Sequence, residues 1–171
     1  MQKKTSSSST RSQKKDIAYL YMSYIWATPT WDFFHSFATK INPEFYSNNQ
    51  RACLDIIVQI CHVLPCPHCQ QHARAFFNIN RIRNTKTKDQ LAQLLLDFHN
   101  DVNRRTGKSV LTLAQLQKYK NAHFINITKQ FLFIFSRYKG TLGAGLSDSM
   151  GRKKMIDAVR NWVNTNHMHF K

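Results

Sequence analysis

The chain has 171 residues, 42% of them hydrophobic, and it carries 25 Lys and Arg against nine Asp and Glu. This hydrophobic content excludes a disordered protein, and the length predicts one globular domain with attached segments. The net charge of +16 predicts a solvated basic surface. Nucleic-acid binding is compatible with that charge but is not predicted from it.

Residues 1–15 are rich in Ser and Lys and are predicted to form a disordered basic tail. They do not have the apolar stretch of a secretory signal. The longest dense apolar run, residues 131–135, is far shorter than the ~20 residues that span a bilayer. We therefore expect a soluble, cytoplasmic protein without a membrane span.

The folded part is predicted to be helical. Apolar side chains recur at helical spacing over residues 30–40, 48–63, 66–78 and 88–105, and Gly107 supplies a C-terminal stop for the last of these helices. Strand alternation is not seen in this region, so the sequence predicts an all-α fold.

The C-terminal part, residues 121–171, is predicted to be a helical extension. A long helix is expected over residues 122–138 and a basic amphipathic helix over residues 152–164. Four glycines favour a flexible linker at 140–151 between them. The last helix is expected either to pack back on the bundle or to bind a partner or a second copy.

Cys66 and Cys69 form a Cys-x-x-Cys motif that opens the helix predicted over residues 66–78. Pro67 suits the first position of a helix, so both sulfurs are expected in its first turn. Unpaired amides and the helix dipole favour a thiolate there, which makes these cysteines good nucleophiles.

A Cys-x-x-Cys alone leaves several classes of protein open. A thioredoxin-like oxidoreductase also uses Cys-Pro-His-Cys, but it needs βαβ units where this chain has helical periodicity. A zinc-binding interaction module would use Cys61, Cys66, Cys69 and His72, although this spacing is cramped for four ligands. We therefore expect no metal.

Two further segments accompany the cysteine pair. The first is Trp26-Ala-Thr-Pro-Thr-Trp31-Asp-Phe-Phe34-His35-Ser-Phe-Ala, and the second is His99-Asn-Asp-Val-Asn-Arg-Arg-Thr-Gly-Lys108. Trp31 and His35 lie four residues apart, so one helix face can present a flat ring and an imidazole to the same ligand. With the cysteines, these segments resemble the three motifs of the Erv/ALR family of FAD-linked sulfhydryl oxidases, in the family's order. The phrase from Leu64 to His72 is especially similar to members from large cytoplasmic DNA viruses.

The resemblance implies a fold and an activity. The fold is a four-helix bundle with a short fifth helix that binds FAD, over residues 16–120. The activity is oxidation of dithiols to disulfides, with electrons passed through FAD to O2 to make H2O2. Cys66 would be the outer sulfur that the substrate attacks, and Cys69 the inner sulfur next to the flavin.

The resemblance also implies the residues that contact FAD. They are Trp26, Thr30, Trp31, His35, His99, Asn100, Val102, Asn103 and Lys108.

Three departures from the family pattern stand out. Ala27 replaces a glycine, which is a small change. The positions of a structural bridge found in many relatives are Leu96 and Leu113, which could hold the same junction by apolar contact. The tails contain no shuttle cysteines, so thiols of the substrate, or of a small redox protein, must reach Cys66 directly.

The other two cysteines of the chain are Cys53 and Cys61. Eight residues apart in one helix, they are separated by about 12 Å, too far for a disulfide, and are expected to be buried free thiols. The resemblance further implies a homodimer and, for a viral late protein, a place in the host cytoplasm and the virion.

Overall fold

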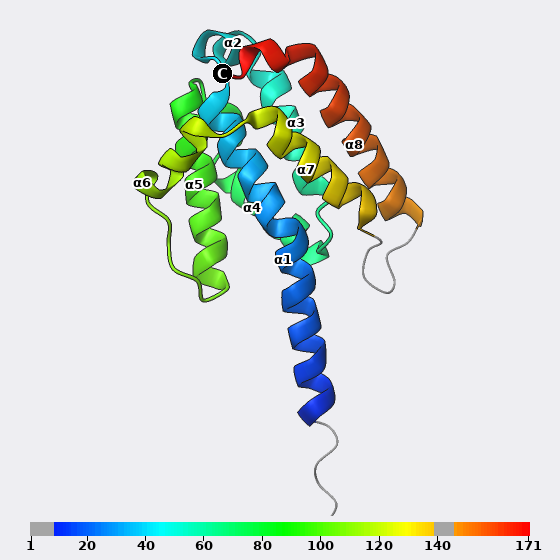
Figure 1. Cartoon of the computed structure of the whole chain (residues 1–171). Helices are drawn as coiled ribbons and strands as arrows, with labels where there is room; N and C mark the ends of the chain where they lie inside the picture. The colour runs from blue at the N-terminus through cyan, green and yellow to red at the C-terminus, as the bar shows by residue number, and fades with distance from the viewer. Residues whose placement is uncertain (1–8, 139–145) are drawn as a thin grey trace, which may run out of the picture.

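The computed structural model describes residues 9–138 and 146–171, with side chains for residues 25–138 and 149–171. These residues form helices without strands, as predicted. Four helices make the bundle: α1 (Ser9–Lys40), α3 (Gln50–His62), α4 (Pro67–Ile79) and α5 (Lys88–Arg105). Figure 1 shows α7 (Phe124–Arg137) and α8 (Leu146–Asn166) lying beside this bundle.

Helix α1 begins much earlier than predicted. It runs from Ser9, so the tail prediction is wrong for residues 9–15, and residues 1–8 lie outside the described part. Pro29 lies inside α1 without ending it. Proline removes one helical donor, and the hydroxyl of Thr30 adds a 2.7 Å bond to the carbonyl of Trp26 in the same turn. The first half of α1 extends away from the other helices (Figure 1).

Polar residues start the next helices. Asn42 caps α2 (Pro43–Asn48), a short helix that was not predicted, by accepting a hydrogen bond from the amide of Phe45. Thr87 and Gln90 form a capping box at the start of α5, whose bounds match the prediction. Gly107 follows α5 with φ of 69°, a left-handed conformation that glycine adopts without strain.

Short elements complete the connections. The 3-10 helix η1 (Ile82–Asn84) joins α4 to α5, and α6 (Leu113–Leu116) and η2 (Gln117–Asn121) lead to α7. The 3-10 helix η3 (His167–His169) follows α8.

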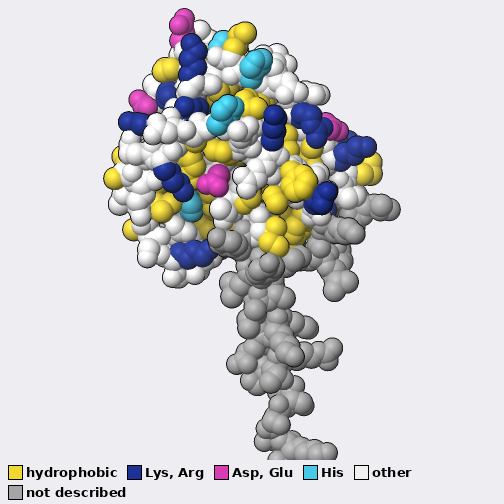
Figure 2. Space-filling model, in the orientation of Figure 1, with side chains coloured by type: hydrophobic (Ala, Val, Ile, Leu, Met, Phe, Trp, Pro, Cys, Tyr) yellow, Lys and Arg dark blue, Asp and Glu magenta, His cyan; other side chains and the backbone are white. Residues whose placement is uncertain are grey.

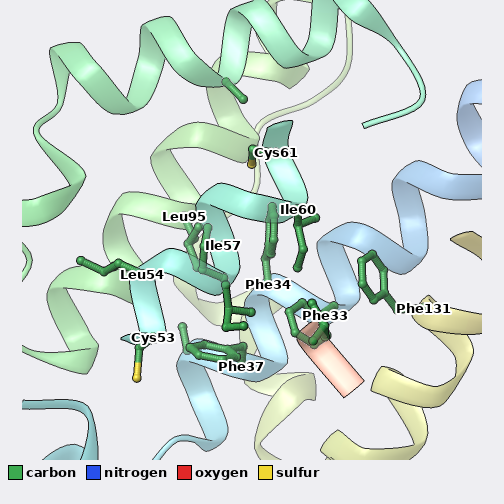
Figure 3. Close-up of a cluster of buried hydrophobic side chains, with 14 of the residues drawn as sticks. Phe33, Phe34, Phe37, Cys53, Leu54, Ile57, Ile60, Cys61, Leu95 and Phe131 are labelled. Carbon is green, nitrogen blue, oxygen red and sulfur yellow. The ribbon is translucent and has the colours of Figure 1, made fainter. Parts of the chain in front are cut away.

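The core is aromatic on α1 and aliphatic on α3. Phe33, Phe34 and Phe37 are at most 1% exposed, and Phe33 meets Phe131 of α7 (Figure 3). The rings of Phe33 and Phe131 stack with centroids 4.9 Å apart. This packing fixes the side of α1 that faces α5 and the site described below.

Cys53 and Cys61 lie in the core as free thiols, as expected (Figure 3). Burial raises the pKa of Cys53 to about 12 and raises that of Cys61 further. Both thiols therefore stay protonated at neutral pH.

Helix α8 packs back on the bundle, in line with the first of its two expected roles. Met155, Ile156, Val159 and Val163 are buried against the core. The helix starts at Leu146, so the predicted linker is wrong for residues 146–151, while residues 139–145 lie outside the described part. The amphipathic face of the helix accounts for this packing.

The last residues return to the end of α1. The amide of Lys171 donates to the carbonyl of Lys40 at 3.1 Å, and the amide of Asn42 donates to the carbonyl of His169 at 2.7 Å. Phe170 stacks on Phe124 with centroids 4.1 Å apart. Residues 167–171 thus close the aromatic core at this end.

Figure 2 shows Lys and Arg scattered over the visible face, with hydrophobic side chains between them and few acids. The positive charge is therefore dispersed on this face. Within the described residues, no helix is long and apolar enough to cross a membrane.

Candidate active site: a disulfide on an aromatic cavity

Cys66 and Cys69 form a disulfide at the N-terminus of α4. Cys66 is the N-cap of the helix, and its sulfur accepts a 3.2 Å hydrogen bond from the amide of Cys69. The side chain of Gln70 donates to the carbonyl of Leu64 and so ties the helix to the loop before it. This geometry favours negative charge on the Cys66 sulfur when the disulfide opens.

The disulfide lies in the wall of a cavity of about 230 Å³ between α1, α4 and α5. Six of the predicted site residues line this cavity: Cys66, Cys69, Trp26, Thr30, Trp31 and Val102. Cys69 is partly exposed, whereas Cys66 is 6% exposed. The structure thus brings two of the sequence motifs together with the cysteine pair.

His35 and His99 meet beside this cavity. The Nε2 atom of His35 lies 2.8 Å from the Nδ1 atom of His99, so one ring donates a hydrogen bond to the other. Trp31 stacks on His99 with centroids 3.9 Å apart and planes 5° from parallel. Helices α1 and α5 are therefore joined by a hydrogen bond and a ring stack.

Both imidazoles are neutral at pH 7. Burial, and then the charges of His99 and Lys118, lower the pKa of His35 to about 3. Burial, followed by Lys108 and Lys118, lowers the pKa of His99 to about 4. Because their charges contribute to these lowered pKa values, Lys108 and Lys118 lie near the histidine pair. An anionic group would be stabilised there.

Asn100 and Asn103 hold the loop that follows α5. The side chain of Asn100 donates to the carbonyl of Leu111 at 2.9 Å and accepts from its amide at 2.7 Å. The side chain of Asn103 donates to the carbonyl of Ser109 at 3.0 Å. These bonds shape the loop that carries Lys108, and direct contact of either asparagine with a cofactor stays a prediction.

The expected contact between Leu96 and Leu113 does not form a buried pair. Leu96 is buried, but Leu113 is 54% exposed. The junction is held instead by the bonds of Asn100 and Asn103 described above. Polar contacts therefore replace the expected apolar ones.

An acid and a tyrosine form a second link between α1 and the rest of the site. The hydroxyl of Tyr119 donates to Asp32 at 2.6 Å, and its ring lies 5.6 Å from that of His35. Burial, and then the bond to Asp32, raise the pKa of Tyr119. The tyrosine therefore stays protonated and keeps η2 against α1.

Several residues of the cavity wall were not predicted: Phe34, His68, His72, Phe98, Arg105 and Thr106. Helical spacing could have found two of them, because His72 follows Cys69 by three residues and Arg105 follows Val102 by three. His72 is hydrogen-bonded to Asp101 at 2.5 Å. Arg105 adds a cation to the wall.

The two alternatives for the cysteine pair find no support in the described residues. They contain no group of three or more His, Cys, Asp or Glu side chains that could hold a metal ion. They also contain no βαβ unit around α4. A thioredoxin-like fold therefore does not fit the part of the chain that the structure describes.

The wall of the cavity suits a flat aromatic cofactor with phosphates. Trp26, Trp31 and Phe98 offer apolar ring faces, and Lys108 and Lys118 lie near the histidine pair at its side. The disulfide lies on the same wall. A helical bundle with this arrangement defines a cofactor-dependent thiol–disulfide oxidoreductase.

The comparisons with known proteins identify the class further. Residues 28–131, from the second half of α1 to the middle of α7, match the model of the Erv1/Alr family. The chain therefore belongs to the Erv1/Alr family.

Relatives come from large DNA viruses. Protein 347L of Invertebrate iridescent virus 6, named as a candidate FAD-linked sulfhydryl oxidase, is 30% identical over 94 residues, which cover 52% of this chain and 85% of that protein. Protein 096R of Invertebrate iridescent virus 3 carries the same kind of name and is 30% identical over 100 residues, covering 56% and 66%. A FAD-linked sulfhydryl oxidase of African swine fever virus (isolate Pig/Kenya/KEN-50/1950) is 24% identical over 104 residues, covering 61% and 84%. No solved structure matches the chain.

Proposed function

We propose that this chain is a FAD-dependent sulfhydryl oxidase that forms disulfides in protein dithiols and reduces O2 to H2O2. The observation that carries the proposal is the Cys66–Cys69 disulfide in the wall of an aromatic cavity built from the other two sequence motifs. Membership of the Erv1/Alr family and the names of the viral relatives support it.

The first half of the reaction is thiol–disulfide exchange. A substrate thiolate attacks the sulfur of Cys66, the Cys66–Cys69 bond breaks, and Cys69 leaves as a thiolate. A second substrate thiol, after losing its proton, attacks the substrate sulfur and releases Cys66. The substrate has then lost two electrons, and the cysteine pair has gained them.

The protein promotes this exchange through the N-terminus of α4. The amide of Cys69 donates to the Cys66 sulfur, so the charge that develops on Cys66 when the second substrate thiol releases it is stabilised. When bound, FAD supplies a two-electron acceptor that reoxidises the cysteine pair and reacts with O2. Trp26, Trp31 and Phe98 would hold its ring, and Lys108 and Lys118 its phosphates.

The substrates proposed are protein dithiols or the thiols of a small redox protein. We further propose that this chain, which has a net charge of +16, works as a homodimer. Its proposed setting is the cytoplasm and, as for a viral late protein, the virion. The viral origin of the relatives supports this setting. Light scattering on the purified protein tests the dimer.

The visible spectrum tests the central proposal. The purified protein should show flavin bands that bleach when a dithiol is added without air and return with O2, as H2O2 appears. A colourless protein that cannot be loaded with FAD would overturn the proposal.

A cysteine variant tests which pair reacts. Cys69→Ser should leave a yellow protein that does not oxidise dithiols. Cys53→Ala is the matched control, because that thiol is buried, protonated and outside the cavity. Full turnover by Cys69→Ser would refute the role given to Cys69.

A further inference from the structure

A second cavity, of about 550 Å³, lies on the other side of α4 from the disulfide cavity. It is formed by the end of α3, the outer face of α4 and η1, and its wall includes His62, Arg74, Phe77, Asn78, Arg81 and Arg83. We call these residues and the space between them the basic cavity. None of them lines the disulfide cavity.

Positive charge in the basic cavity is largely uncompensated. Residues 50–84 contain four arginines but a single acid, Asp55. Asp55 pairs with Arg83 at 2.7 Å, with both side chains well exposed. Among the described residues, Arg74 and Arg81 form no salt bridge of this kind. Like charges gathered around one space favour the binding of an anion.

A further observation places His62 and Arg74, two side chains of the basic cavity, close together. Burial, and then the charge of Arg74, lower the pKa of His62, so the two side chains interact. Arg81 has φ of 48°, a left-handed conformation unusual for a residue with a side chain. Arg81 precedes η1 as its N-cap and lines the wall of the basic cavity.

The basic cavity is a short distance from the disulfide. His62 ends α3, four residues before Cys66. Arg74 lies eight residues after Cys66 along α4, about 12 Å along the helix axis. An extended peptide covers this axial distance in about four residues at ~3.3 Å each and needs further residues to pass around α4. A single polypeptide can therefore reach both places.

The two faces of α4 line two different cavities. Cys69 and His72 are three residues apart and line the disulfide cavity. Arg74, Phe77 and Asn78 follow the i, i+3, i+4 spacing of the opposite face and line the basic cavity. Cys66 is the N-cap of α4 and lines the disulfide cavity.

We propose that the basic cavity docks an acidic segment of the protein whose dithiol is oxidised at Cys66. Arginine forks bind carboxylates in pairs of hydrogen bonds, and Phe77 offers an apolar base for the stem of a Glu side chain. The inference rests on the proposed thiol oxidase function and names the chemistry of its substrate.

Matched peptides test the proposal on the full-length, flavin-loaded protein. Each peptide carries a Cys-x-x-Cys dithiol, with either four Glu or four Gln placed four residues away. At low salt, KM for the Glu peptide should be about tenfold lower than for the Gln peptide, since two ion pairs supply about 1.4 kcal/mol. This difference should shrink in high salt.

Charge variants then locate the effect. Arg74→Gln with Arg81→Gln should raise KM for the Glu peptide about tenfold and leave KM for the Gln peptide unchanged. Lys129→Gln with Lys153→Gln removes the same charge from exposed positions on α7 and α8 and is the control. If both pairs of variants behave alike, or if the Glu and Gln peptides have equal KM values, the proposal is wrong.

Two controls separate this inference from the proposed function. Dithiothreitol needs no docking, so a failure of the protein to oxidise it would refute the proposed oxidase function itself. A Glu peptide with Ser in place of Cys cannot react, and its binding, measured by fluorescence anisotropy, tests docking alone. If that peptide does not bind while inorganic polyphosphate does, the basic cavity is a phosphate site and the inference fails.

Discussion

His35 and His99 are 64 residues apart in the sequence, yet their ring nitrogens lie 2.8 Å apart at the contact between α1 and α5. Both rings are neutral, and the ring of His99 stacks on that of Trp31. The pair therefore holds two of the three sequence motifs together beside the disulfide cavity.

His99→Ala should weaken flavin retention while leaving the disulfide intact. The variant loses the bond to His35 and the stack on Trp31, worth about 1–2 kcal/mol together, so flavin affinity should fall about tenfold. The ratio of flavin to protein absorbance after gel filtration, with a thiol titration, measures both properties. His123→Ala, at an exposed position, is the control, and equal flavin loss in the two variants would contradict the role of His99.

Stability should fall below neutral pH because of the same histidine pair. In the unfolded chain both rings titrate near 6.5, whereas in the folded chain their pKa values are about 3 and about 4. Below pH 6.5 the unfolded state therefore binds protons that the folded state does not. The free energy of unfolding should drop by up to about 1.4 kcal/mol per pH unit for each histidine, down to about pH 4.

Urea unfolding at pH 7.5, 6.5, 5.5 and 4.5 measures this slope. The slope should be smaller in a His99→Gln variant, which removes one of the two titrating groups. A wild-type slope that does not change on this substitution would show that other groups cause the acid sensitivity.

Asn100→Ala should destabilise the loop after α5. It removes two hydrogen bonds to Leu111 at a site that is 8% exposed, which should cost about 2 kcal/mol of unfolding free energy. Thermal and urea unfolding measure the loss, and Asn126→Ala on the exposed face of α7 is the control. A change no larger than that of the control would mean that the loop does not depend on Asn100.

Val159→Ala should show whether α8 belongs to the core. Val159 is fully buried, so loss of its methyl groups should lower the unfolding free energy by about 1–2 kcal/mol. Asn161→Ala, on the exposed side of α8, should have little effect. If Val159→Ala changes the oligomeric state but not the stability of the protomer, α8 acts in assembly instead.

The sequence predicted elements with strong local signals well. Helix α5 has a capping box, a regular apolar face and a glycine stop, and its bounds agree with the prediction. The start of α4 at Pro67 follows from the first-turn preference of proline. Local side-chain chemistry determines where these helices begin and end, so the sequence alone predicts their bounds.

Elements that depend on distant partners were predicted less well. The helix before Pro29 has a weak periodic signal, so α1 was placed too short. The first turns of α8 contain Gly151, which favours a linker when read alone. Contacts with α3 and α7 hold that helix in place, and a sequence pattern does not show them.

The residues of the site were likewise predicted only in part. The aromatic and cysteine residues of the motifs meet at the disulfide cavity, as their order suggests. The asparagines bond to the loop backbone, and the bond between His35 and His99 joins two distant helices. Such partners follow from the packing of α1 on α5, which periodicity alone does not specify.

The closing contacts of residues 167–171 have a consequence for synthesis on the ribosome. Phe37 contacts Trp162, and Phe124 stacks on Phe170, so both rings are covered by residues that are translated well after them. A nascent chain can assemble the motifs of α1, α4 and α5 early, yet it presents open aromatic surface until Trp162 and Phe170 emerge. During that interval, chaperones and neighbouring chains meet a partly folded protein whose cysteines are already in place.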